Sequence, residues 1–207
     1  MKLQISFDMT DLEKAIIIAQ NVAPFASIFE IGGLLLYKHG IKSIEQFRAQ
    51  FPDKTILADA KIIDRGKDSV SLLAQAGADW ITVMGGTHNQ VIHAATTAAH
   101  NLNRKIMVDL LDASSLGQSA LEAKSLGADA VLFHESYEEP ESLVFLERWN
   151  MVRGNTTLPV FLSGKINRII IDNIIALQPD GIIIGKAITE ASNPAEEAQF
   201  YFEKCGG

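Results

Sequence analysis

The sequence predicts a single α/β domain, a (β/α)8 TIM barrel, and three observations lead to that prediction. Short β-branched and apolar runs alternate with amphipathic helical patterns along all 207 residues. The apolar runs begin roughly 20 to 30 residues apart, which is the length of a strand with its crossover helix. No composition break or Pro/Ser-rich linker divides the chain, so we expect residues 1–207 to form one domain.

Each predicted strand is a short run of mainly Ile, Val, Leu, Phe or Met bounded by turn residues. The runs, in order, are Leu3–Phe7, Ser27–Ile31, Thr55–Asp59, Trp80–Met84, Lys105–Asp109, Ala130–His134, Pro159–Ser163 and Gly181–Gly185. A doubly wound open sheet is the alternative. Such a sheet would usually carry a glycine-rich dinucleotide fingerprint after its first strand, where this chain has Asp8–Thr10.

Helices are expected to begin where a capping residue is followed, three positions later, by Glu or Gln. These pairs are Thr10 with Glu13, Ser43 with Gln46, Thr87 with Gln90, Ser115 with Gln118, and Asn193 with Glu196. The helical patterns are amphipathic, so each helix is expected to pack one apolar face on the barrel.

The charge balance argues against a nucleic-acid partner, because 18 basic and 25 acidic residues give a formal net charge of −7 without a Lys/Arg stripe. A few local cations and backbone N–H groups can still hold one phosphate. No apolar run approaches the roughly 20 residues that span a bilayer, and the start of the chain lacks a signal pattern. We therefore expect a cytoplasmic protein with no membrane partner. The single cysteine, Cys205, forms neither an internal disulfide nor a cysteine-based zinc site.

Polar residues end most of the predicted strands, and the carboxyl ends of the strands are where such barrels carry their functional groups. These residues are Asp8, Glu30, Asp59, Lys61, Asp109, His134 and Ser163. Four of them are carboxylates, which repel one another unless cations compensate. Lys61 and a divalent metal are two such cations, and the oxygen ligands of Glu30 and Asp59 suit Mg²⁺.

Each of these residues also has an ordinary structural interpretation. Asp8 can simply cap a helix, and for this residue the two interpretations weigh equally. Asp59 and Lys61 lie two apart, on one side of an extended chain, and can form a surface ion pair; the apolar run before them favours a site instead. His134 can be a satisfied core residue, but its position at the barrel mouth favours proton transfer.

A phosphate group is expected where the last two strands turn into helices. Ser163, Gly164 and Lys165 occupy the first of these turns, and Gly185 and Lys186 occupy the second. The glycines allow close backbone approach, and each lysine is expected at a helix N-terminus. Ordinary turn chemistry is the alternative for either pair taken alone.

The Asp59, Lys61 and Asp64 positions form a D-x-K-x-x-D pattern that resembles the motif of the orotidine 5'-monophosphate decarboxylase suprafamily. Within it, the chain is similar to the group of 3-hexulose-6-phosphate synthases and 3-keto-L-gulonate-6-phosphate decarboxylases, and the resemblance runs nearly end to end. The segments that match in order are 3–8, 29–32, 57–66, 107–110 and 184–189.

The resemblance implies a magnesium ion held by Glu30 and Asp59, next to the enediolate of a phosphorylated sugar that Lys61 neutralises. It also assigns roles to the other charged residues: Asp8 and Asp109 would contact substrate hydroxyls or the lysine, and His134 would relay a proton. Asp64 would reach into the active site of a neighbouring subunit, so the resemblance implies a homodimer with shared sites.

The two activities of the group differ in what becomes of the enediolate. The setting of Asp109 and the position of Tyr137, three after His134, resemble the synthase, with Tyr137 expected to contact substrate. Residues 60–62 with Gly66 and Lys67 are closer to the decarboxylase. We weigh the first pair more heavily because its members should face the substrate. The leading hypothesis is therefore a synthase that adds formaldehyde to ribulose 5-phosphate, with the decarboxylase as the alternative.

A hypothesis of another class is a barrel that binds a sugar phosphate without catalysis. It is suggested by Glu138–Glu141, which replace an Ala-Ala-Gly-containing loop typical of both activities. Glu30, Asp59, Lys61 and His134 argue against it, because binding alone does not require a metal site and a proton carrier together.

Overall fold

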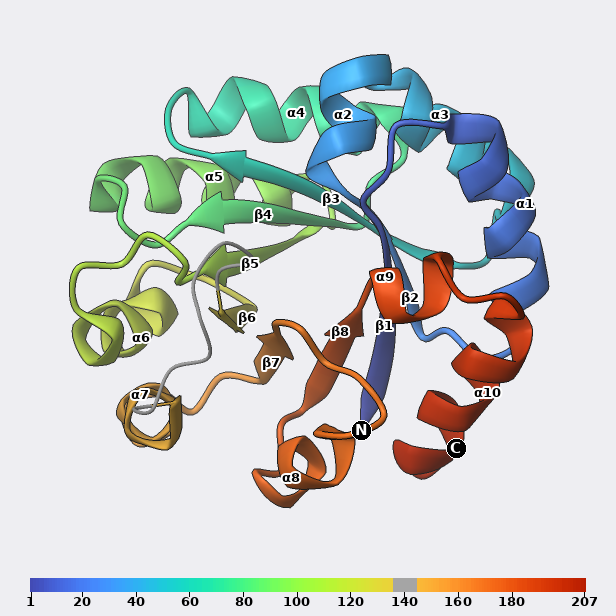
Figure 1. Ribbon diagram of the computed structural model, residues 1–207. Helices are drawn as coiled ribbons and strands as arrows, with labels where there is room; N and C mark the ends of the chain where they lie inside the picture. The colour runs from blue at the N-terminus through green and yellow to red at the C-terminus, as the bar shows by residue number, and fades with distance from the viewer. Residues whose placement is uncertain (136–144) are drawn as a thin grey trace.

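The computed structural model describes residues 1–135 and 145–207. Eight parallel strands close into a barrel in the order β1 to β8, and helices surround it, as predicted (Figure 1). The strands are β1 (Lys2–Phe7), β2 (Ile28–Ile31), β3 (Thr55–Ile62), β4 (Trp80–Met84), β5 (Lys105–Asp109), β6 (Ala130–His134), β7 (Val160–Ser163) and β8 (Gly181–Ile184). Because β1 pairs with β8, the sheet has no open edge, and the doubly wound alternative is excluded.

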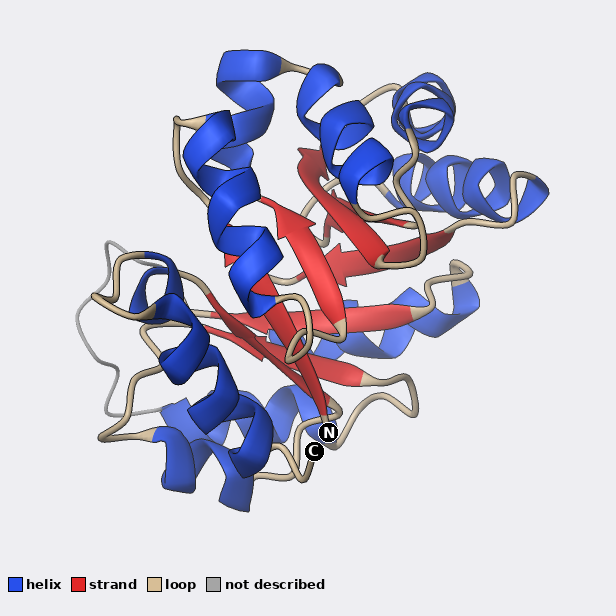
Figure 2. Cartoon of the chain, turned by 90° about the vertical axis from the view of Figure 1, so that its right-hand side faces the viewer, coloured by secondary structure: helices blue, strands red, loops and turns tan. Residues whose placement is uncertain are grey.

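Helices cover the outside of the barrel on all sides (Figure 2). They are α1 (Leu12–Val22), α2 (Gly33–His39), α3 (Lys42–Gln50), α4 (Gly66–Ala76), α5 (Asn89–Asn101), α6 (Leu116–Ser125), α7 (Phe145–Arg153), α8 (Ile171–Ala176), α9 (Lys186–Thr189) and α10 (Pro194–Lys204). Within the described residues, every helix is too short or too polar to cross a membrane.

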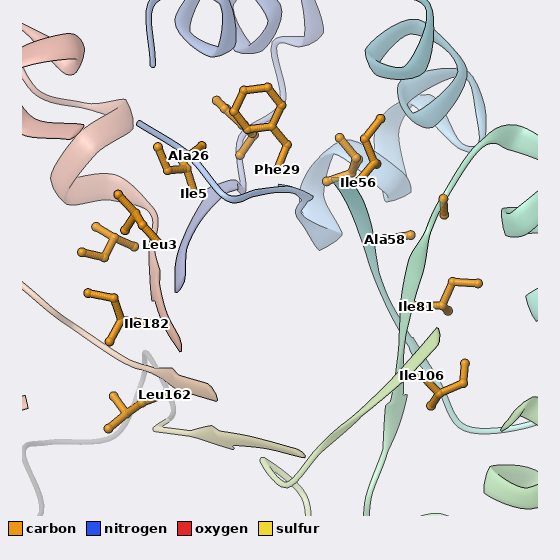
Figure 3. Close-up of a cluster of buried hydrophobic side chains, with 14 of the residues drawn as sticks. Leu3, Ile5, Ala26, Phe29, Ile56, Ala58, Ile81, Ile106, Leu162 and Ile182 are labelled. Atoms are coloured by element: carbon orange, nitrogen blue, oxygen red, sulfur yellow. The ribbon is translucent and has the colours of Figure 1, made fainter. Parts of the chain in front are cut away.

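Two apolar layers form the core. The larger layer lies between strands and helices and includes Leu3, Ile5 and Phe29 (Figure 3). The smaller cluster is separate from it and consists of Ile28, Leu57, Trp80, Met107, Ala130, Leu132, Phe161 and Ile183. Side chains alternate between the two faces of a strand, so a buried set distinct from the helix-facing set fills the barrel interior.

The predicted strands match the observed ones to within one residue except at β3, which continues to Ile62 instead of ending at Asp59. The additional residues form a bulge. Between Ala58 and Ile62, β3 advances four residues while β4 advances two, from Ile81 to Val83. The excess residues of β3 leave the regular ladder, which no pattern of apolar residues could predict.

Two of the predicted helix starts are confirmed. Asn193 precedes α10, and its Oδ1 accepts a hydrogen bond from the Glu196 amide at 3.4 Å. Ser115 is the N-cap of α6, although its side chain makes no capping hydrogen bond.

The other three starts were wrong by one or two residues. The N-cap of α1 is Asp11 instead of Thr10, and that of α5 is His88 instead of Thr87. The helix expected to start at Ser43 begins at Lys42. The hydroxyls of Ser43 and Thr87 donate instead to backbone carbonyls, of Gly40 at 2.7 Å and Ile63 at 2.7 Å respectively, which removes them from the capping role.

The Arg48 guanidinium of α3 fastens the amino-terminal ends of β3 and β4. It donates to the carbonyls of Gly77 at 2.8 Å and Lys54 at 2.9 Å, and it forms an ion pair with Asp79. Gly77 is required here: its φ is +111°, and an added Cβ would fall 2.9 Å from Cγ of Arg48. This contact set lies at the end of the barrel opposite the polar strand termini, so it contributes to stability and not to a site.

Replacing Arg48 with Met should destabilise the fold by about 2 kcal/mol, because partly buried carbonyls lose a donor and the Asp79 carboxylate keeps only the Ile56 amide and Arg104. Urea unfolding measures the loss. The matched control is Arg153→Met, whose ion pair with Asp180 joins side chains 41% and 42% exposed and should contribute about 0.5 kcal/mol. Equal losses in the two variants would contradict the assignment.

Candidate active site

A chain of contacts joins four charged side chains at the carboxyl ends of β3, β5 and β6. The Lys61 ammonium forms an ion pair with Asp59 and lies 3.8 Å from Oδ2 of Asp109. The same Oδ2 is 2.9 Å from Nδ1 of His134. The structure therefore brings together four of the residues that the sequence placed at the mouth, and it alternates carboxylates with basic side chains.

The Asp109 carboxylate is fully buried and satisfied on both oxygens. Its Oδ1 accepts the Leu111 amide at 3.0 Å, while Oδ2 faces His134 and Lys61. Burial alone would lower the pKa of His134, but the hydrogen bond and charge of Asp109 outweigh it, so the pKa of His134 is raised. Because Asp109 contacts Nδ1, Nε2 is the ring nitrogen at which any proton exchange with a substrate would occur.

Lys61 remains a cation although it is largely buried. Desolvation lowers the pKa of its ammonium, but the charges of Asp59 and Asp109 raise it by more, and the pKa is raised overall. The Lys61 backbone has φ +46°, in the left-handed region, where a residue other than glycine costs on the order of 1–3 kcal/mol. A strained residue that holds a buried charge beside two carboxylates is typical of a functional position.

Glu30 lies beside this chain of contacts on β2 and is 7% exposed. Its Oε2 accepts from Nε2 of Gln4 and its Oε1 from Oγ of Ser6, each at 2.5 Å. Burial, followed by the charge of Asp59, raises the pKa of Glu30 to about 7 despite these two donors and Lys61. The positive charge around Glu30 is therefore too small to keep the pKa of this carboxyl at its ordinary value.

Glu30 and the neighbouring Asp59 fit the donor set of Mg²⁺, which takes one or two carboxylates and completes its shell with water or substrate oxygens. Among residues 1–135 and 145–207, no group of three or more His, Cys, Asp or Glu side chains is placed to hold a metal. A structural zinc site, which needs four protein ligands, therefore does not fit the described residues, whereas a magnesium site on Glu30 and Asp59 does.

The Thr82 side chain on β4 faces the bulge of β3. Its hydroxyl accepts the Lys61 amide at 2.9 Å and donates to Oδ1 of Asp59 at 3.0 Å. The sequence suggested that Asp59 and Lys61 meet through the two-residue spacing of a regular extended strand, and this interpretation was wrong. They meet across a bulge, in which the Lys61 backbone amide and the Asp59 side chain both hydrogen-bond the Thr82 hydroxyl.

Two other predicted residues lie apart from these contacts. Asp8 is exposed, and its Oδ1 accepts the Leu34 amide in the first turn of α2 at 2.8 Å. The capping interpretation therefore holds for Asp8, but on α2 and not on the next helix in the chain. Asp64 is exposed on the loop after β3, where its Oδ1 accepts the Arg65 amide at 2.7 Å.

The predicted phosphate residues follow β7 and β8. Ser163 pairs with His134 in the ladder between β6 and β7, and Gly164 comes next. Gly185 is the N-cap of α9 and Lys186 its first residue, as predicted. Lys165 was expected at a helix N-terminus and is not at one, because α8 begins only at Ile171. Tyr137 lies outside the described residues.

Sequence reasoning missed Gln4, Ser6 and Thr82, which contact the predicted metal ligands. A signal for them exists, because Gln4, Ser6 and Asp8 are polar at alternate positions of β1 and the residue after it, and Thr82 interrupts the apolar run of β4. In a strand with one apolar face, such alternation places the polar side chains together on the other face.

Comparisons with known proteins show the family and the fold of this chain. The model of the orotidine 5'-phosphate decarboxylase / HUMPS family matches residues 1–201. The 3-hexulose-6-phosphate synthase of Staphylococcus aureus (strain USA300) is 32% identical over 201 residues, 96% of each chain. The crystal structure of 3-hexulose-6-phosphate synthase from Salmonella typhimurium has a TM-score of 0.92 and 29% identity, over 99% of this chain and 98% of that one. The crystal structure of 3-keto-L-gulonate-6-phosphate decarboxylase from Vibrio cholerae has a TM-score of 0.88 and 25% identity, over 99% and 97% of the two chains.

The pair of Asp109 and His134 predicts an unusual titration. By NMR, the imidazole of His134 should titrate above its ordinary pKa of 6.5, and Asp109→Asn should move the pKa below that value, since burial and Lys61 then dominate. The raised pKa means that protonated His134 stabilises the fold, and this contribution is lost as pH rises through the folded-state pKa. His39, His88, His93 and His100 serve as internal references; an unchanged His134 in the variant would contradict the assignment.

Proposed function

The chain belongs to the orotidine 5'-phosphate decarboxylase / HUMPS family of lyases, and from that premise we propose that it is a magnesium-dependent 3-hexulose-6-phosphate synthase. The reaction would join ribulose 5-phosphate and formaldehyde through an enediolate. The observation that carries the proposal is the contact chain from Asp59 through Lys61 and Asp109 to His134, next to Glu30. The proposal is supported by a permanent cation and an imidazole that lie beside two carboxylates of the kind that bind Mg²⁺.

Lys61 would provide fixed positive charge where the substrate becomes negative. Removing a proton from C1 of ribulose 5-phosphate leaves an enediolate, whose charge lies on the oxygens of C1 and C2. An ammonium that is held by two carboxylates needs no reorganisation to stabilise this charge, which is the condition for electrostatic catalysis. Mg²⁺ bound by Glu30 and Asp59 would supply further charge stabilisation for sugar oxygens.

His134 would carry the proton. In the addition, a base takes the proton from C1, the C1 carbon forms a bond to the carbon of formaldehyde, and the former aldehyde oxygen gains a proton. The imidazole is suited to move these protons because Asp109 fixes its orientation through Nδ1. Asp8 and Asp109 would contact substrate hydroxyls or the lysine.

The phosphate would lie over the turns after β7 and β8. Gly164 and Gly185 permit close approach of backbone N–H groups, with Ser163 and Lys186 next to them. Tyr137 is the further proposed contact to the substrate. This family binds phosphorylated sugars, which supports a sugar phosphate over other small anions.

A 3-keto-L-gulonate-6-phosphate decarboxylase is the second candidate. It is favoured by the similarity to the Vibrio cholerae enzyme of that name, whose structure covers 99% of this chain at a TM-score of 0.88. That reaction would use the same cation and the same proton carrier, since loss of carbon dioxide also leaves an enediolate. The two candidates differ in whether the enediolate attacks formaldehyde or accepts a proton.

We also propose that the protein acts as a homodimer in which Asp64 completes the partner's site. Asp64 is exposed, and the neighbouring Ile63 is 65% exposed. On α2, Leu34 and Tyr37 are 44% and 81% exposed. Large apolar side chains exposed at the rim of a site support a covering partner subunit.

The first experiment incubates the protein with ribulose 5-phosphate and magnesium, with and without formaldehyde, in deuterated water. Formaldehyde consumption together with exchange of the C1 proton is the expected result. Exchange without consumption would favour another acceptor than formaldehyde or a carboxylated substrate, as in the decarboxylase. Absence of both, together with turnover of 3-keto-L-gulonate 6-phosphate, would replace the synthase with the decarboxylase, and absence of all three would favour a binding protein.

Asp59→Asn should lower kcat by about 10²–10³-fold and remove the dependence on magnesium, because one proposed metal ligand loses its charge. The fold should persist, as judged by circular dichroism. The control is Asp172→Asn, which changes a carboxylate 73% exposed that pairs with Lys204 at the surface. Normal turnover by Asp59→Asn would remove the metal assignment.

Mixing two inactive variants tests the shared site. Lys61→Met and Asp64→Asn should each be inactive, but a mixed dimer has one site with an intact Lys61 and the partner subunit's intact Asp64. If subunits exchange freely, about a quarter of wild-type activity should return, because half of the dimers are mixed and each holds one complete site. A mixture that stays inactive after verified subunit exchange would show that Asp64 does not act across subunits.

A further inference from the structure

The Thr82 hydroxyl is the only group among the described residues that hydrogen-bonds both the backbone of Lys61 and the side chain of Asp59. Thr82 is 1% exposed and lies on β4 opposite the bulge of β3. One oxygen atom therefore connects the two charged residues of the D-x-K segment. This connection comes from a different strand, so it is independent of the ion pair between the two residues.

The bulge explains why a side chain is needed at this point. Ladder pairing stops at Ala58 and resumes at Ile62, and Lys61 adopts a left-handed backbone conformation between them. A half-buried amide that has left the ladder still requires an acceptor. The hydroxyl of Thr82 supplies it at 2.9 Å.

The direction of each hydrogen bond follows from the chemistry of the partners. The Lys61 amide can only donate and the ionised Asp59 carboxylate can only accept, so the hydroxyl must accept from the first and donate to the second. Its single proton is thereby committed to Oδ1 of Asp59. The other oxygen, Oδ2, is left facing the Lys61 ammonium.

We propose that Thr82 is a positioning residue that fixes the bulge conformation of Lys61 and the rotamer of Asp59, and so sets the geometry in which both act. The effect of Thr82 on catalysis rests on the proposed function, whereas its effect on the conformation of Lys61 and Asp59 does not. The hydroxyl is the required element, and the γ-methyl group contributes only packing.

The variants Thr82→Val and Thr82→Ser separate these two contributions. Val keeps the shape and removes the hydroxyl, whereas Ser keeps the hydroxyl and removes the methyl group. The matched control is Thr96→Val, because Thr96 is also 1% exposed and its hydroxyl donates to the Leu126 carbonyl at 2.6 Å, on α5 and away from the strand ends. Thermal unfolding of all three variants corrects for lost stability.

Amide hydrogen exchange at Lys61 measures the structural contact without reference to activity. It should be at least about tenfold faster in Thr82→Val than in the wild type, and close to wild type in Thr82→Ser and Thr96→Val. An unchanged exchange rate in Thr82→Val would overturn the proposal.

Two measurements give the consequence for the site. The first is titration of the metal-free protein with Mn²⁺, followed by electron paramagnetic resonance. The second is the rate of exchange of the C1 proton of ribulose 5-phosphate. Thr82→Val should weaken Mn²⁺ binding and slow proton exchange by about 10- to 100-fold, with KM little changed, and Thr82→Ser should stay within about threefold. Equal losses in Val and Ser would reduce Thr82 to a packing residue and overturn the proposal. A wild-type protein that neither binds Mn²⁺ nor exchanges the C1 proton would contradict the proposed function and, with it, the catalytic role of Thr82. The rate of amide hydrogen exchange at Lys61 would still decide whether the structural contact exists.

Discussion

The buried ammonium of Lys61, in contact with Asp59 and Asp109, is the interaction on which the polar end of this barrel depends. Glu30, Asp59 and Asp109 place three carboxylates in one interior, and Asp109 has no exposed surface at all. Lys61 supplies one permanent positive charge against them, so negative charge remains uncompensated. The pKa of Glu30, raised to about 7 by burial and by Asp59, shows where this deficit falls. A cation that enters this end of the barrel would therefore meet Glu30 first.

The barrel can hold this charge because the polar and apolar groups lie in separate layers. The inner cluster that contains Leu57, Met107 and Phe161 is apolar and buried, and the polar side chains follow it toward the carboxyl ends of the same strands. Lys61 and Arg65, two of the four non-glycine residues with positive φ in the described part of the chain, lie at that end on either side of one short loop. At the opposite end, Arg48 fastens the starts of β3 and β4.

The sequence contained most of the fold because a short apolar run that ends in a polar residue is a local pattern that survives any detail of packing. Glu30, Asp109 and His134 were predicted at their strand ends for this reason. The bulge at Asp59–Lys61 was not predicted, since it contains no glycine or proline and depends on the pairing register of β3 against β4. Thr87 and Ser43 misled the prediction of helix starts because carbonyls from outside those helices compete for their hydroxyls. That competition is a tertiary effect, which local propensity does not encode.

The ionisation of His134 connects this geometry to the choice between the two reactions. To remove the C1 proton, the imidazole must begin neutral; to protonate an enediolate after loss of carbon dioxide, it must begin charged. Asp109 raises the pKa of His134 and favours the charged form, whereas burial and the Lys61 ammonium favour the neutral one. These opposing contributions come from side chains that surround His134. A substrate that changes the charge near Lys61 would therefore shift the balance between the charged and neutral forms of His134. Under the proposed roles, the same four side chains would serve either reaction, and the substrate that completes the site would determine the direction in which His134 moves its proton.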